Sequence, residues 1–185
     1  MRYLDSKPAA VNPAAGPQEA SVFSVTQFNE ADGADAAAAV RPCLDIDRWV
    51  DAIVEKRPYA DIQAVMEVAQ QAADPFTDDE LAAALRHHPR IGERAAGATT
   101  EAGLSRAEQA GVSDDADVAR RLADGNRAYE ERFGHVFLIR AAGRSSEEIL
   151  AALEQRLTNS ADTEKLIMAD QLRQIALLRL QGVIG

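Results

Sequence analysis

The chain has 185 residues, a hydrophobic fraction of 46% and a formal net charge of −10. This length suits one domain with a sizeable core, and the acidic balance argues against a nucleic-acid surface, which needs clustered positive charge. The single cysteine, Cys43, excludes an intramolecular disulfide and is typical of a small buried apolar residue in a reducing compartment. No apolar run in the sequence is long enough to span a bilayer, so we expect no membrane partner.

The first 20 residues differ in composition from the rest of the chain. They hold three of the seven prolines, are rich in alanine and show no helical or strand periodicity. A basic start followed by an apolar stretch, the signature of a signal peptide, is missing. We therefore expect a disordered leader over residues 1–20 and one folded domain over residues 21–185.

Apolar spacing predicts helices along most of the chain, whereas alternating runs of β-branched residues are nearly absent. The first helix is expected over residues 26–40, weakened by Gly33 and ended by Pro42. A second helix follows within residues 45–56, and its apolar residues share one face: Ile46, Trp49, Val50, Ile53 and Val54. A third is expected over residues 61–72, with an inward face formed by Ile62, Val65, Met66 and Ala69.

A fourth helix begins at "TDDE", where Thr77 and Glu80 have the spacing of a capping box. It should end near His87, because the residue before a proline avoids the helical conformation. Residues 92–104 contain three glycines and are predicted to form a loop, after which another helix begins at Ser105.

The second half of the chain is also predicted to be helical. A long helix is expected over residues 115–132, stopped by Gly134, and "HVFLIR" at 135–140 is typical of extended or buried chain. The motif "SSEE" caps a helix over residues 147–157, and the last helix covers residues 162–180. Its apolar stripe is expected to contain Leu166, Ala169, Leu172, Ile175, Ala176 and Leu180. We predict an all-α fold, a single-domain helical bundle of about eight helices.

Two of the three histidines stand together in "LRHHPRIGER" at 85–94. Side chains of adjacent helical residues point about 100° apart, so His87 and His88 do not suit joint binding of one metal ion. The third histidine, His135, has no companion at metal-ligand spacing, and we expect no metal site. A histidine at a helix end can donate or accept a proton near neutral pH, but it can equally stabilise the helix dipole.

Two further stretches each allow a structural and a functional interpretation. In "LSRAEQAG" at 104–111, Ser105 and Glu108 have capping-box spacing, yet Glu108 is also a candidate partner of His88 in an acid–base pair. In "NRAYEERFGHVFLIRAAGRS" at 126–145, the non-helical part is either a buried connector or a segment whose backbone groups bind a polar ligand. Spacing alone does not decide either case.

Taken together, "RWVDAIVEKRPY", "HHPRIG", "SRAEQAG" and "NRAYEERFGHVFLIRAAGRS" resemble the 2-oxo-4-hydroxy-4-carboxy-5-ureidoimidazoline (OHCU) decarboxylase family of uric acid degradation. The resemblance runs from about residue 28 to residue 180. It implies an all-helical, cofactor-free decarboxylase that converts OHCU to (S)-allantoin and forms a homodimer. The chain ends in "QGVIG" and not in the peroxisomal Ser-Lys-Leu, so we expect a cytoplasmic location. Two departures stand out: "HPRIGE" replaces the "HPDLAG" of eukaryotic members, and His135 occupies a position where the family has an aromatic residue.

The resemblance also assigns roles to individual residues of this chain. It implies that His88 and Glu108 are catalytic. The substrate-binding residues that it implies are Pro89, Ser105, Arg106, Ala107, Glu108, Gln109, Phe137, Leu138, Ile139, Arg140 and Ala141. It assigns no role to His87 or His135. Two other interpretations remain open: a non-enzymatic helical module that binds a ligand or partner, and a hydrolase that acts on another ureido compound.

Overall fold

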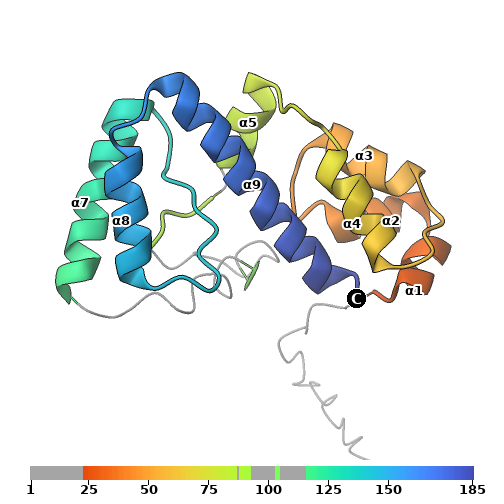
Figure 1. Ribbon diagram of the computed structural model, residues 1–185. Helices are drawn as coiled ribbons and strands as arrows, with labels where there is room; N and C mark the ends of the chain where they lie inside the picture. The colour runs from red at the N-terminus through yellow and green to blue at the C-terminus, as the bar shows by residue number, and fades with distance from the viewer. Residues whose placement is uncertain (1–22, 87, 93–102, 105–115) are drawn as a thin grey trace, which may run out of the picture.

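The computed structural model describes residues 23–86, 88–92, 103–104 and 116–185 (Figure 1). The leader expected over residues 1–20 and the helix expected from residue 105 lie outside these ranges. The loop expected over residues 92–104 is wrong at its end, because residues 103–104 are helical. Within the described ranges the chain forms eight helices: α1 (Val25–Glu30), α2 (Gly33–Val40), α3 (Asp47–Glu55), α4 (Ile62–Gln71), α5 (Asp78–Leu85), α7 (Ala116–Phe133), α8 (Ser146–Arg156) and α9 (Ala161–Val183). The predicted all-α fold is confirmed.

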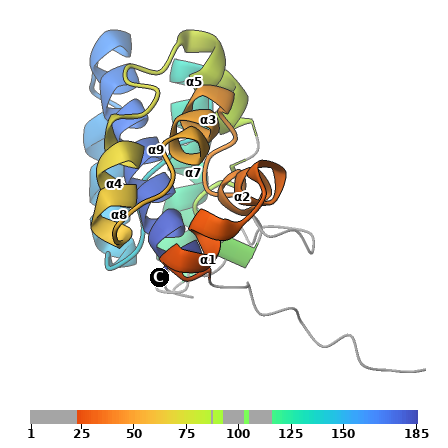
Figure 2. The same cartoon turned by 90° about the vertical axis from the view of Figure 1, so that its right-hand side faces the viewer.

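The long helix α9 runs between two groups of helices (Figure 1). Helices α1 to α4 form one group, at the near end in Figure 2, and α7 and α8 pair to form the other. A large hydrophobic cluster joins α1 to α5 with α9, and a second cluster lies between α7, α8 and the chain that connects them. No helix of the described ranges combines the length and the apolar character that crossing a membrane requires.

Local sequence signals explain where several helices begin. The side chains of Thr77 and Glu80 make the predicted capping box at α5, and those of Ser145 and Glu148 make one at α8. The apolar face predicted for residues 45–56 is confirmed as the buried face of α3, including the fully buried Trp49. These helix starts depend on contacts three residues apart, which is why the sequence predicts them.

The single helix predicted over residues 26–40 is wrong, because the structure has α1 and α2 there. The backbone of Ala31 and Asp32 leaves the helical conformation, with ψ of 147° and 151°. The carbonyl groups released at this break accept hydrogen bonds from Arg57, whose Nη1 atom lies 2.7 Å from both Phe28 O and Ala31 O. A side chain 26 residues further along therefore stabilises the break.

The prediction that Leu166 belongs to the buried stripe of α9 is also wrong, since this residue is 73% exposed. Successive helical residues are about 100° apart, so Leu166 lies on the opposite side of α9 from the buried Met168. The inward position on the preceding turn is taken by Glu164, which is fully buried. The remaining residues of the predicted stripe are buried or half-buried.

Candidate active site

His88 lies just beyond the end of α5, where the sequence predicted that a proline would stop the helix. Helix α5 ends at Leu85, and the backbone N–H of His88 donates to the Leu85 carbonyl at 3.2 Å. His88 and Pro89 are both half-buried, so the imidazole stands at the boundary between interior and solvent. His87 lies outside the described residues.

Hydrogen bonds at two residues connect the chain that follows His88 to α7. The Arg90 guanidinium binds both carboxylate oxygens of Glu130, with distances of 2.5 and 2.8 Å, and these hydrogen bonds hold the pKa of Glu130 below its ordinary value. The buried Asn126 donates from Nδ2 to the Ile91 carbonyl at 3.0 Å. The two contacts bind the side chain of Arg90 and the backbone of Ile91, which follow His88 closely in the chain. They therefore restrict the position of His88 relative to α7.

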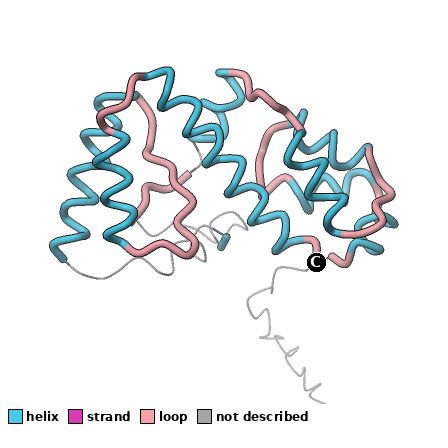
Figure 3. The backbone as a smooth tube through the Cα atoms, in the orientation of Figure 1, coloured by secondary structure: helices cyan, strands magenta, loops and turns pink. Residues whose placement is uncertain are grey.

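The second segment implied by the family resemblance, residues 137–141, runs as non-helical chain beside α8 (Figure 3). The side chains of Phe137, Ile139 and Ala141 pack in the cluster between α7 and α8, whereas Leu138 packs in the larger cluster with α9. Side chains that alternate between two faces are typical of extended chain. The prediction of extended or buried chain at "HVFLIR" is therefore confirmed, and the segment lies between the two hydrophobic clusters.

A buried charged network holds this segment from one side. The Arg156 side chain donates from Nη1 to the Leu138 carbonyl at 2.8 Å and pairs with Glu164, whose Oε1 atom lies 2.7 Å from Nε. Glu164 also accepts hydrogen bonds from the Tyr129 hydroxyl and from Asn159 Nδ2. Burial alone would raise the pKa of Glu164, but these donors outweigh burial and lower it, so the carboxylate stays ionised inside the protein.

A side chain of α9 also contacts the segment. The backbone N–H of Arg140 donates to Gln171 Oε1 at 3.0 Å, and the Gln171 side chain is itself buried. Helices α8 and α9 thus each provide one polar side chain that binds the backbone of residues 137–141.

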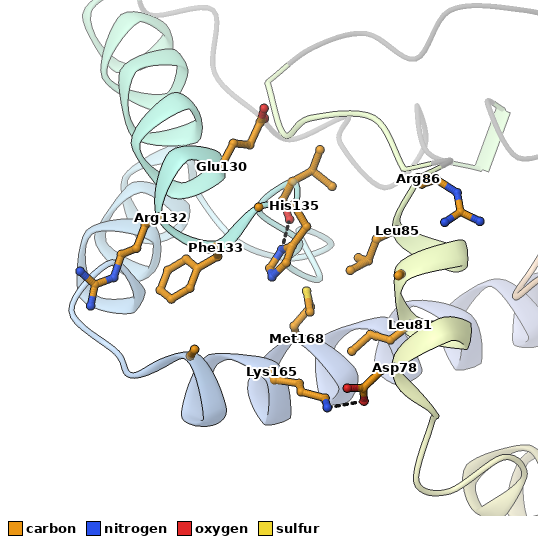
Figure 4. Close-up of a pocket in the computed structure, with 14 residues that line it drawn as sticks. Asp78, Leu81, Leu85, Arg86, Glu130, Arg132, Phe133, His135, Lys165 and Met168 are labelled. Atoms are coloured by element: carbon orange, nitrogen blue, oxygen red, sulfur yellow. Dashed lines mark hydrogen bonds and ion pairs between the residues drawn. The ribbon is translucent and has the colours of Figure 1, made fainter.

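A cavity of about 830 Å³ opens between α5, the end of α7 and the start of α9 (Figure 4). Its floor is apolar, with Leu81, Leu85 and Met168, and an Asp78–Lys165 ion pair stands at one side. The His135 ring, for which the sequence suggested no role, lines this cavity. None of the site residues named from the sequence is among the described residues that line it. The cavity adjoins the candidate site, since its walls include residues just before His88 and just before residues 137–141.

The His135 ring contacts three neighbouring residues. Nδ1 lies 3.2 Å from the Val136 carbonyl oxygen, and the ring stacks against Phe133 with centroids 6.2 Å apart. The His135 ring also makes an edge-to-face contact with the Tyr129 ring, with the two centroids 5.5 Å apart. An imidazole thus takes part in an aromatic cluster, which explains how a histidine replaces the aromatic residue typical of the family.

Sequence reasoning missed the polar residues that support the site. Arg156, Glu164 and Gln171 were not singled out, and neither was Arg179, which is only 5% exposed on α9. The signal was present in the spacing of α9, where positions 164, 171 and 179 share the inward face with Leu172 and Ile175. A polar residue on such a face is buried and needs a partner, so it marks a structural or functional contact.

The other half of the predicted catalytic pair lies outside the described residues. This applies to Glu108 and to four of the substrate-binding residues implied by the resemblance: Ser105, Arg106, Ala107 and Gln109. Their proximity to His88 therefore stays a prediction.

The structure defines a helical protein with a half-buried histidine just beyond the end of α5 and a buried, non-helical segment over residues 137–141. A model of the OHCU decarboxylase family matches residues 29–181, and the chain belongs to that family. It is 30% identical over 157 residues to the 2-oxo-4-hydroxy-4-carboxy-5-ureidoimidazoline decarboxylase of Haloferax volcanii, with 74% of this chain and 89% of that protein covered. It is 24% identical to the uric acid degradation bifunctional protein of Bacillus sp. TB-90, of which it spans 32%.

Solved structures show the same likeness. A crystal structure of OHCU decarboxylase in the presence of (S)-allantoin superposes with a TM-score of 0.60 at 25% identity, covering 76% of this chain and 92% of that one. A crystal structure of (S)-allantoin synthase has a TM-score of 0.67 at 17% identity, covers 88% of this chain and 54% of the other, and supports the fold alone.

Proposed function

We propose that this chain decarboxylates OHCU to (S)-allantoin, with His88 and Glu108 as its acid–base pair. The observation that carries the proposal is the half-buried His88 just beyond the end of α5, in a chain of this family whose residues 137–141 form a buried, non-helical segment. Homologues named as OHCU decarboxylases support the reaction.

The chemistry of the substrate explains why these residue types suffice. The carboxylate that leaves is bonded to a ring carbon that also bears a hydroxyl, next to a ring C=N bond. When the C–CO2 bond breaks, its electron pair forms a C=C bond and the imine pair moves to nitrogen, which takes up a proton. The enol that results loses its hydroxyl proton and gains one on the neighbouring carbon, which gives allantoin. The substrate thus provides its own electron acceptor, and the protein has only protons to move.

Each residue of the pair has a defined task in this proposal. Glu108 accepts the hydrogen bond of the substrate hydroxyl and removes its proton as the carbonyl forms. His88 orients the leaving carboxylate and delivers a proton to one face of the neighbouring carbon, which sets the S configuration. Acid–base groups of this kind contribute roughly 10²–10⁴-fold each. The backbone of residues 137–141 holds the ring.

We further propose that the chain forms a homodimer, which rests on the family resemblance, and that it is cytoplasmic. The oligomeric state is tested by sedimentation equilibrium on the full chain, where a single species of twice the monomer mass is expected.

The decisive test supplies freshly generated OHCU and follows allantoin by circular dichroism. We expect (S)-allantoin to form faster than the spontaneous reaction. Racemic allantoin at the spontaneous rate would overturn the proposal and favour a binding module or a different ureido substrate. His88→Asn is expected to abolish turnover with an unchanged helical spectrum. The matched control is His135→Asn, which alters a histidine of the adjoining cavity and should leave turnover within a few-fold of the parent.

A further inference from the structure

The 137–141 segment presents its two backbone edges to different surroundings. In extended chain the N–H and C=O of one residue point to the same edge, and those of the next residue point to the opposite edge. Phe137, Leu138 and Ile139 pack alternately between the two hydrophobic clusters, as side chains of extended chain do. Residues 138 and 140 therefore share one edge, and residues 137, 139 and 141 share the other.

The edge formed by residues 138 and 140 is bound to the protein. The Leu138 carbonyl accepts from Arg156 of α8 at 2.8 Å, and the Arg140 amide donates to Gln171 of α9 at 3.0 Å. Because a backbone N–H can only donate, the atom of Gln171 that it meets is the acceptor Oε1.

The backbone groups on the edge formed by residues 137, 139 and 141 have different hydrogen-bond partners. The Ala141 carbonyl accepts from the Arg144 amide at 3.0 Å, which begins the turn toward α8. Among the described residues no hydrogen bond reaches the backbone N–H or C=O of Ile139, although its side chain is buried. A buried backbone donor and acceptor normally have partners. An adjacent N–H and C=O on one edge match the alternating amide groups of a ureido compound.

We propose that Gln171 is a positioning residue for substrate, an inference that rests on the proposed decarboxylation. Gln171 holds the Arg140 amide and thereby keeps the Ile139 edge turned toward the ring. A shift of the segment by one residue would exchange the two edges, since backbone groups alternate with a period of two. Arg156 holds the same edge at Leu138, so the segment is fixed at two points on the side away from the ligand.

This role has a kinetic signature. The backbone of Ile139 contacts the ring in the ground state and in the transition state alike, whereas it takes no part in proton transfer. Loss of its position should weaken both states equally, which raises KM and leaves kcat almost unchanged. A residue that merely supports the fold would instead lower the melting temperature without this separation of KM from kcat.

The test compares three variants of the full chain. Gln171→Leu removes the acceptor at similar size, and Gln171→Glu keeps an acceptor oxygen. Gln174→Leu alters a glutamine one turn further along α9 whose side chain donates to Asp170. We measure kcat and KM for OHCU, together with amide hydrogen exchange over residues 137–141. Gln171→Leu is expected to raise KM on the order of tenfold, the size of one lost hydrogen bond, and to speed exchange of the Arg140 amide. Gln171→Glu and Gln174→Leu should resemble the parent in both measurements.

Two results would overturn the inference: an unchanged Arg140 exchange rate in Gln171→Leu, or the same KM in Gln171→Leu and Gln174→Leu. A parent that forms no (S)-allantoin is a separate failure. It would refute the proposed function and substrate positioning with it, while hydrogen exchange would still report whether Gln171 holds the segment.

Discussion

Replacing Arg156 by methionine is expected to destabilise the fold strongly. The Arg156 side chain is 7% exposed and that of its partner Glu164 is 1% exposed, with an Nη2–Oε1 distance of 2.5 Å. Its guanidinium also binds the Leu138 carbonyl and lies 4.6 Å from the ring centroid of Phe137. Methionine fills similar volume, so the change removes the charge and the donors and leaves the packing largely intact.

The size of this destabilisation follows from the loss of the ion pair between Glu164 and Arg156. An ionised carboxylate left buried without its partner destabilises a protein by roughly 3–5 kcal/mol. For a chain of this size each kcal/mol lowers the melting temperature by about 2–4 °C, which gives a decrease of roughly 6–20 °C. The matched control is Arg121→Met, which breaks an ion pair with Glu154 whose side chains are 49% and 56% exposed. Such surface pairs contribute about 0–1 kcal/mol.

Thermal unfolding followed by circular dichroism at neutral pH measures these differences. The double variant Arg156→Met with Glu164→Leu should regain much of the lost stability, because neither partner then leaves an unpaired buried charge. The Leu138 carbonyl and the Tyr129 hydroxyl stay without these partners, at a cost of about 1–3 kcal/mol each at most. A single variant that melts within about 2 °C of the parent, or a double variant no better than the single one, would refute the reasoning.

Three further predictions concern other parts of the molecule. Hydrogen bonds from Arg48 lower the pKa of Glu80 from 4.5 to about 2. The stability that this pair contributes is therefore present above pH 4.5 and is lost as the pH falls toward 2. In Glu80→Gln the melting temperature should depend less on pH over this range. Gly125→Ala places a Cβ 2.6 Å from Leu153 Cδ2 and should lower the melting temperature. Gly182→Ala should raise it slightly, because its Cβ would meet no atom of the described residues within 4 Å outside its own stretch of helix. Turnover of OHCU should be unaffected by chelators, because the substrate provides its own electron acceptor; loss in EDTA that a divalent ion restores would contradict this.

Features that depend on near neighbours in the chain were predictable from the sequence. The capping boxes at Thr77 and Ser145, the end of α5 before Pro89 and the extended chain at 135–140 all follow from contacts or steric limits within a few residues. The motifs around His88 indicated the family for the same reason, since short segments of a site are continuous in sequence.

Features that depend on distant partners became visible only in the tertiary structure. The break between α1 and α2 is stabilised by Arg57, 26 residues beyond the carbonyl of Ala31. The burial of Glu164, while Leu166 on the same helix is exposed, depends on Arg156 from α8 and on Tyr129 from α7. Hydropathy alone predicts the reverse, because it does not include a partner's charge.

The same distinction applies to the candidate site. The sequence by itself determined the helical class, the positions of most helices, the family and the short segments that carry His88 and residues 137–141. The tertiary structure decided which backbone edge of that segment is bound by Arg156 and Gln171, which lie 18 and 31 residues away from their partners. Contacts at such separations form only when helices pack, and packing depends on the shape and charge of every facing side chain together.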